Sequence, residues 1–204
     1  MSLLIKQGVD DFMEIFTVPV GISNRHVHLS QEHIEALFGE GYTLTRIKDL
    51  SQPGQFACEE TVTLIGPKGS LSSVRILGPA RKISQVELTE TDTFKIGVKP
   101  PIRDSGKLEG TPGIDIEGPN GRVHIDQGVI VAARHIHMSP EDARMHSLKD
   151  GDYVCVNIPG PRGGVLEQVL VRVNRDYALD LHVDTDEGNA FRLANGQQLE
   201  VCAK

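Results

Sequence analysis

An internal repeat constrains the fold of this chain more than any other feature of its sequence. The segment SNRHVHLS at 23–30 recurs as AARHIHMS at 132–139. Downstream of each copy, GPKG at 66–69 corresponds to GPRG at 160–163, and VELTETD at 86–92 corresponds to LHVDTD at 181–186. Similar segments in the same order and at nearly the same spacing indicate two copies of one structural unit.

Each unit is expected to consist mainly of short strands. Apolar runs rich in β-branched residues lie at 61–65, 73–77, 128–132 and 169–173, and 21 glycines and 11 prolines supply turns throughout the chain. Helices are predicted directly after the serines that end the two repeated segments, because serine is a favourable N-cap residue. Many short strands with few helices favour β-barrels or sandwiches over a parallel α/β sheet.

The N-terminal segment at 1–16 is predicted to form a short amphipathic helix. Apolar residues recur at helical spacing between 5 and 16, and Pro19 follows. Such a helix either packs on its own domain or docks on a partner as a targeting element.

Charge and composition exclude several classes of partner. The net charge of −7, without a basic stripe, argues against nucleic acid. No apolar run approaches the roughly 20 residues that cross a bilayer, and the N-terminus does not resemble a secretory signal. Three cysteines without a C-x-x-C motif suit a reducing cytoplasm.

The repeated histidines predict two metal sites. Residues i and i+2 of a strand share a face, so His26 and His28 can present their imidazoles to one metal. His135 and His137 can do the same in the second copy. The downstream repeat supplies a third ligand for each pair, because Glu87 and His182 occupy corresponding positions. The two predicted ligand sets are His26/His28/Glu87 and His135/His137/His182. Three protein ligands with an open fourth position are typical of catalytic zinc.

A structural interpretation would suffice for a single H-x-H motif, but two matched copies favour metal binding. Zinc suits nitrogen-rich ligands, although cobalt, nickel or iron could bind the same set. His33, His124 and His146 have no such partners and are expected to be ordinary surface or core histidines. Arg81 lies shortly before Glu87 in the chain and is a candidate anion ligand; the alternative is a solvated loop charge.

Several motifs together resemble the PduL-type phosphate propanoyltransferases. These are SNRHVHLS, LGPARKISQVELTETD, PPIRDSG, GTPGI, GVIVAARHIHMSP and LHVDTDEGNAF, in order over about residues 17–191. The resemblance implies two similar β-barrel domains capped by short α-helices, with a site for two zinc ions per chain between them. It further implies that one barrel contains 17–24 plus 133–204 and that the other contains 25–132.

The implied reaction converts acyl-CoA and phosphate into acyl phosphate and CoA, with propanoyl-CoA or acetyl-CoA as substrate. The resemblance places a phosphate-binding role on Arg81 and the metal ligands on the six residues above. It implies CoA contacts at Lys48, Arg75, Leu77, Phe94, His182 and Asn189, with Phe94 contributed by a neighbouring chain of a homo-oligomer. The enzyme is expected to be cytoplasmic. Family members often work inside bacterial microcompartments that degrade propanediol, so the alternative is that the 1–16 segment docks on shell or lumen proteins of a microcompartment.

Two other functions fit the spacing of the histidines. A zinc-dependent hydrolase, such as a thioesterase, would need neither CoA nor phosphate as an acceptor. A non-catalytic β-barrel scaffold stabilised by zinc would need a closed, four-ligand site.

Overall fold

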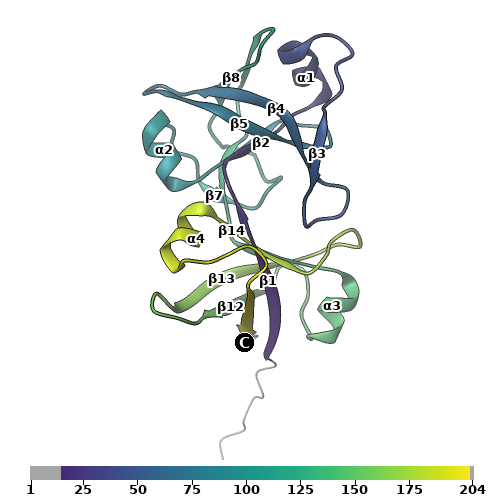
Figure 1. Ribbon diagram of the computed structural model, residues 1–204, viewed down its shortest axis with the longest axis vertical. Helices are drawn as coiled ribbons and strands as arrows, with labels where there is room; N and C mark the ends of the chain where they lie inside the picture. Colours follow the sequence, from purple (N-terminus) through teal and green to yellow (C-terminus); the bar gives the residue numbers. More distant parts are fainter. Residues whose placement is uncertain (1–14, 203–204) are drawn as a thin grey trace, which may run out of the picture.

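The computed structural model describes residues 15–202, which form a mainly β structure with four short helices (Figure 1). One sheet is a closed barrel built from β1 (Ile15–Ser23), β11 (His135–Met138), β12 (Tyr153–Ile158), β13 (Gly164–Val173), β14 (Asp180–Asp184) and β15 (Gln198–Cys202). Its strand order is β1-β14-β11-β13-β12-β15. We call this sheet the first barrel.

The remaining strands form a nine-stranded sheet, which we call the second sheet. It contains β2 (His26–His28), β3 (Arg46–Asp49), β4 (Phe56–Ile65), β5 (Ser70–Gly78), β6 (Gln85–Leu88), β7 (Ile102–Arg103), β8 (Ile114–Glu117), β9 (Arg122–Ile125) and β10 (Val129–Ala132). The order is β7-β10-β6-β2-β5-β4-β8-β9, and β3 pairs with β4. The predicted fold class, mainly β with barrel-like sheets capped by short helices, is confirmed.

Alternating burial explains why each sheet encloses its own apolar core. In β12, Val154, Val156 and Ile158 are buried, whereas Tyr153 and Asn157 are exposed and Cys155 is half-buried, which is the two-residue period of a strand with one face in a core. The first barrel and the second sheet each enclose a separate cluster of buried aliphatic side chains. The side chains of the histidine motifs described below belong to neither cluster.

Four capped helices follow four short strands. They are α1 (Gln31–Phe38) after β2, α2 (Glu90–Ile96) after β6, α3 (Pro140–Met145) after β11 and α4 (Thr185–Phe191) after β14. Each N-cap side chain, from Ser30, Thr89, Ser139 or Asp184, accepts a hydrogen bond from a backbone N–H in the first turn. Such caps end each strand at a fixed residue and start the helix immediately after it.

The two repeats pair their strands in the same way. In the second sheet β2 lies parallel to β5 and antiparallel to β6, and in the first barrel β11 lies parallel to β13 and antiparallel to β14. The strand before each histidine pair, however, joins the opposite sheet. β1 precedes β2 but pairs with β14 and β15, whereas β10 precedes β11 but pairs with β6 and β7. The chain therefore crosses between the sheets immediately before each histidine pair.

Polar contacts also join the two sheets away from these crossings. The side-chain amide of Gln52 is buried; it donates to the Ala178 carbonyl at 3.0 Å and accepts from the Ala178 N–H at 3.2 Å. The backbone N–H of Thr91 in α2 donates to Asp186 of α4 at 2.8 Å. Figure 1 shows α2 and α4 on the same side of the molecule, one above the other.

The predicted helix at 1–16 lies outside the described residues except for its last two positions. Ile15 and Phe16 begin β1 and pair with Cys202 and Val201. The Phe16 side chain is buried in the core of the first barrel and stacks on the ring of His146 at 3.8 Å. The prediction of a helix is therefore wrong for residues 15 and 16, which belong to β1 because they pair with β15. Within 15–202, no helix has the length and apolarity needed to cross a membrane.

Candidate two-metal site

The two histidine pairs occupy equivalent positions on paired antiparallel strands. In the second sheet His26 lies opposite Glu87. In the first barrel His135 lies opposite His182. Because alternate residues share a face, the second histidine of each pair, His28 or His137, lies beside the first on the same side of the sheet. The strand register thus brings together the residues that the sequence repeat nominated.

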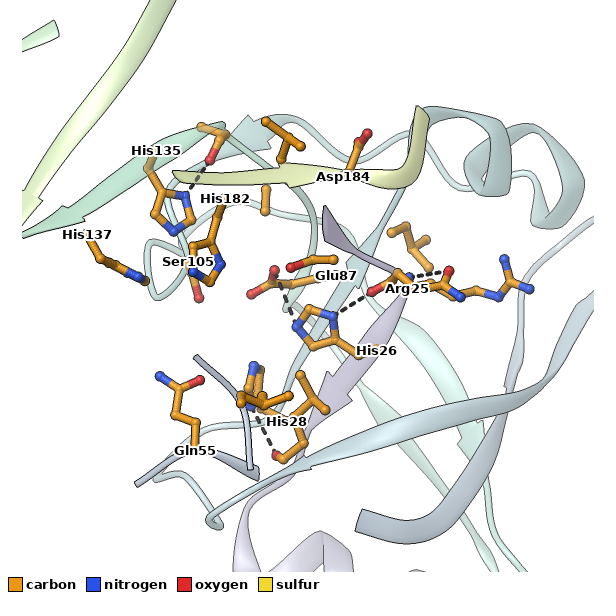
Figure 2. A pocket seen from close by; sticks show the side chains of 18 of the residues that line it. Arg25, His26, His28, Gln55, Glu87, Ser105, His135, His137, His182 and Asp184 are labelled. Carbon is orange, nitrogen blue, oxygen red and sulfur yellow. Dashed lines mark hydrogen bonds and ion pairs between the residues drawn. The ribbon is translucent and has the colours of Figure 1, made fainter. Parts of the chain in front are cut away.

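Two clusters of three potential ligands result. Within each of the sets His26/His28/Glu87 and His135/His137/His182, the candidate ligand atoms lie within 4.8 Å of one another. The four strand-borne histidines of the H-x-H motifs are between 3% and 7% exposed. Figure 2 shows both clusters facing a common cavity between the sheets.

Backbone carbonyls orient the histidine rings in matching ways. His26 Nδ1 lies 2.8 Å from the carbonyl oxygen of Asn24, and His135 Nδ1 lies 2.8 Å from that of Ala133. His28 Nδ1 is 3.1 Å from the Leu77 carbonyl. A ring that donates from Nδ1 keeps the lone pair on Nε2 for a metal. On the other side of the ring, His26 Nε2 lies 3.4 Å from Glu87 Oε2, the oxygen of the third predicted ligand.

The second cluster contains two buried nitrogen atoms that lack hydrogen-bond partners. These are His137 Nδ1 and His182 Nε2. The Asp180 carboxylate lies 3.1 Å from His182 Nε2, but without the alignment of a hydrogen bond. The His137 ring packs against Tyr177, with their centroids 4.0 Å apart. Buried polar atoms without partners are uncommon, and the Nδ1 atom of His137 is available to a bound ion.

Three of the site histidines, His28, His135 and His137, are held in their neutral form. Burial and the neighbouring His135 and His182 lower the pKa of His137 to about 2. Burial and the neighbouring His182 lower the pKa of His135 to about 4. Burial, with the nearby His26, keeps the pKa of His28 well below its usual range. At neutral pH these rings need not lose a proton before they bind a metal.

Glu87, in contrast, is held in its ionised form. Burial alone would raise the pKa of this carboxyl, but His26 and His28 lower it to about 2. The first cluster therefore offers one anionic oxygen and two imidazole nitrogens, whereas the second offers three imidazole nitrogens.

Two arginines from opposite sheets converge on Ser105. Arg81 Nη1 donates to the Ser105 hydroxyl at 3.4 Å, and Arg172 Nη2 donates to the Ser105 carbonyl at 3.4 Å. Burial lowers the pKa of Arg81; Glu87 raises it, and the like charge of Arg172 lowers it further. Arginine remains charged at neutral pH. Two partly buried guanidinium groups near one serine form an attractive site for an anion.

The cavity has a volume of about 240 Å³. Its lining includes both ligand sets, the two arginines that meet at Ser105, and the following residues from both sheets: Ser23, Asn24, Arg25, Leu50, Gln55, Leu77, Leu88, Thr89, Ser105, Ala132, Ala133, Tyr177, Val183 and Asp184. Arg81, the predicted anion ligand, lines the same cavity as both ligand sets, and its role in binding an anion stays a prediction.

Only two of the six residues predicted to contact CoA line this cavity. Leu77 and His182 line the cavity, whereas Lys48, Arg75 and Asn189 do not. Lys48 is exposed on β3 and Asn189 is exposed on α4. Arg75 Nη1 donates to the carbonyls of Cys58 and Glu59 at 2.9 and 2.6 Å. Phe94 also lies outside the lining and is 79% exposed on α2.

Sequence reasoning missed Arg172, Tyr177 and Ser105. Arg172 lies opposite His137 in the register of β11 and β13, so a correct strand pairing would have nominated it. Ser105 belongs to PPIRDSG, one of the motifs that carried the family resemblance, but nothing in its spacing indicated a role. No sequence signal pointed to Tyr177.

Matching ion pairs brace the two points where the chain crosses between the sheets. Arg25, directly before His26, pairs with Asp92 of α2 at 2.8 Å. Arg134, directly before His135, pairs with Glu187 of α4 at 2.7 Å. These pairs fix the crossing segments whose carbonyls orient the two rings.

Comparison with known proteins places this architecture in a family. The sequence profile described as phosphate propanoyltransferase matches residues 19–194. A phosphate propanoyltransferase from Thermotoga maritima is 58% identical over 183 residues, which cover 89% of this chain and 87% of the relative. Proteins of the same name from Rhodobacter capsulatus and Rhodopseudomonas palustris are 53% and 52% identical, covering 90% and 97% of this chain and 86% and 85% of the relatives. The chain therefore belongs to the phosphate propanoyltransferase family.

Proposed function

We propose that the chain transfers an acyl group between coenzyme A and phosphate, using propanoyl-CoA or acetyl-CoA, at a site that holds two zinc ions. The observation that carries the proposal is the convergence of two three-ligand clusters and two arginines on one cavity. Three ligands in each cluster, among the described residues, match the open coordination of catalytic zinc and not the closed coordination of a structural site.

The residues of both clusters fit zinc. One set would hold an ion with two imidazoles and a carboxylate, and the other with three imidazoles, all common zinc ligands. A bound metal would also satisfy the nitrogen that lacks a partner on His137. Zinc held in this way acts as a Lewis acid and favours the thiolate form of a thiol.

The arginines are proposed to bind and orient phosphate. Arg81 and Arg172 approach Ser105 from opposite sheets, and guanidinium groups match the geometry of phosphate oxygens. A phosphate held there faces both clusters across the cavity. One of its oxygens attacks the thioester carbonyl, the carbon–sulfur bond breaks, and the sulfur leaves as the CoA thiolate. Positioning and charge stabilisation supply the rate enhancement, without a covalent acyl-enzyme.

The CoA chain is proposed to extend from the cavity past Leu77, which lies near His28. The roles of Lys48, Arg75, Phe94 and Asn189 in CoA binding stay predictions, as do the homo-oligomer that would supply Phe94 and the division of the chain into 17–24 plus 133–204 and 25–132. The 79% exposure of Phe94 is compatible with a contact to a neighbouring chain.

The test combines metal analysis with a thiol-release assay. We expect about two zinc ions per purified chain and release of free CoA from propanoyl-CoA only when phosphate is present. An assay in the reverse direction, from propanoyl phosphate and CoA, should form the thioester. Release without phosphate would instead indicate a thioester hydrolase, and two zinc ions without any release would indicate a scaffold.

We also propose that the N-terminal segment directs the enzyme into a microcompartment, on the basis of its sequence pattern. The deletion should end at residue 14, because Phe16 is buried in the first barrel. A fluorescent fusion lacking 1–14 is expected to be dispersed in microcompartment-forming cells while its specific activity stays unchanged. A fusion that still forms foci without these residues would contradict the proposal.

A further inference from the structure

Each metal cluster has an additional polar residue at an equivalent position. Gln85 precedes Glu87 by two residues in β6, and Asp180 precedes His182 by two residues in β14. Gln85 lies opposite His28 in its sheet, whereas Asp180 lies opposite His137 in the first barrel. Both side chains are almost completely buried, at 1% and 4% exposure.

The Gln85 amide is fixed so that its donor faces the Glu87 carboxylate. Its Nε2 donates to Glu87 Oε1 at 2.5 Å and to the Ser105 hydroxyl at 2.8 Å. Its Oε1 accepts from the Gly106 N–H at 2.8 Å, so the amide cannot turn over without losing that bond. The other carboxylate oxygen, Glu87 Oε2, remains on the side of His26.

Asp180 presents the opposite chemistry to His182. Its carboxylate is acceptor-only and lies 3.1 Å from His182 Nε2, although these two atoms are not aligned as a hydrogen bond. Asp180 is not one of the three residues whose ligand atoms lie within 4.8 Å of one another. It therefore lies next to a predicted ligand without being a member of the ligand set. With Nε2 facing Asp180, the Nδ1 atom of His182 is the nitrogen left for a metal.

We propose that Gln85 and Asp180 are positioning residues whose hydrogen-bonding polarity is matched to the third ligand of each cluster. A carboxylate ligand accepts a hydrogen bond from an amide donor, and an imidazole ligand faces a carboxylate acceptor at 3.1 Å. Each outer residue fixes the orientation of one ligand and thereby the affinity of one metal site. Partners of this kind change metal affinity by about 10- to 100-fold in other proteins. The inference rests on the proposed two-zinc site.

The first experiment measures zinc affinity by competition with a chromophoric chelator. Asp180→Asn keeps the size of the side chain but removes its charge, and Asp180→Ala removes the contact. In a His28→Ala background, where only the second cluster binds zinc, both changes should weaken the remaining zinc site, by about 10- to 100-fold for Asp180→Ala. Gln85→Ala in the same background should leave that site unchanged. In a His137→Ala background, where only the first cluster binds zinc, Gln85→Ala should weaken the remaining zinc site and Asp180→Ala should leave it unchanged.

A matched exchange tests polarity directly. Glu87→His alone places an imidazole beside an amide donor and should weaken the first zinc site. Adding Gln85→Asp reproduces the pairing of the second repeat and should recover much of the affinity. Circular dichroism and thermal unfolding of the metal-free proteins establish that each variant is folded. A residue with only a structural role would give no such rescue.

The outcomes separate this inference from the proposed function. If the unmodified chain binds two zinc ions but all Gln85 and Asp180 variants keep its affinities, the positioning role is wrong and the two-zinc site stands. Equal loss from both sites in each variant, or no rescue by Gln85→Asp, also overturns the role. If the unmodified chain binds no zinc, the proposed two-zinc site itself fails.

Discussion

Replacing Arg81 by alanine is expected to lower kcat/KM for phosphate by about 10²- to 10³-fold, the loss typical of removing one preorganised charge donor. Arg81 reaches Ser105 in the cavity but is not a member of either ligand cluster. Zinc content should therefore stay at about two per chain. Arg172→Ala should act on the same kinetic parameter, because its guanidinium converges on Ser105 from the other sheet. Steady-state kinetics over a range of phosphate concentrations, with metal analysis, measure both effects.

Lys82 provides a matched control for Arg81. It is the next cation in the chain and is exposed, and it does not line the cavity, so Lys82→Ala should retain normal phosphate kinetics. If Arg81→Ala loses zinc and activity in equal proportion, the arginine supports the metal site and does not bind phosphate.

Replacing His135 by alanine is expected to leave about one zinc per chain and to reduce turnover by about 10³-fold. The expectation follows because a catalytic metal supplies several kcal/mol of transition-state stabilisation, and each 1.36 kcal/mol is tenfold in rate. His135 is one of three ligands in its cluster, so its removal leaves two imidazoles. His26→Ala should have the corresponding effect on the first cluster. Metal analysis and thiol release together measure the loss.

His124 is the control for these substitutions. It lies on β9 beside Asp115, at 2.6 Å, and outside the cavity. His124→Ala should keep two zinc ions and full activity. Retention of both zinc ions by His135→Ala would contradict the ligand assignment.

The ligand clusters could be predicted from the sequence because both signals that define them are simple. Two-residue alternation places His26 and His28 on one face, and the internal repeat aligns Glu87 with His182. The structure brings each set together. Arg172 escaped detection because its counterpart in the other repeat, next after Ile76 in β5, is the uncharged Leu77.

Features that depend on strand pairing could not be read from local patterns. The alternating residues of β1 predict a strand but do not say which sheet will accept it; only the family resemblance assigned it to the C-terminal barrel. Phe16 fits a helical period equally well, and its pairing with Val201 decides the conformation. Gln85 and Asp180 stayed hidden because equivalent positions in the repeats carry different side chains.

The exchange of β1 and β10 between the sheets has a consequence for biosynthesis. Ile15 pairs with Cys202, so the first barrel cannot close until residue 202 has left the ribosome. At about 5–20 residues per second, β1 waits roughly 10 to 40 seconds for β15. Pro19 lacks an N–H group and so limits pairing of the waiting strand with other nascent chains. Because His182 follows all three ligands of the first cluster in the chain, the second metal cluster can be completed only after the first has been synthesised, and a chain that stops before His182 cannot form it.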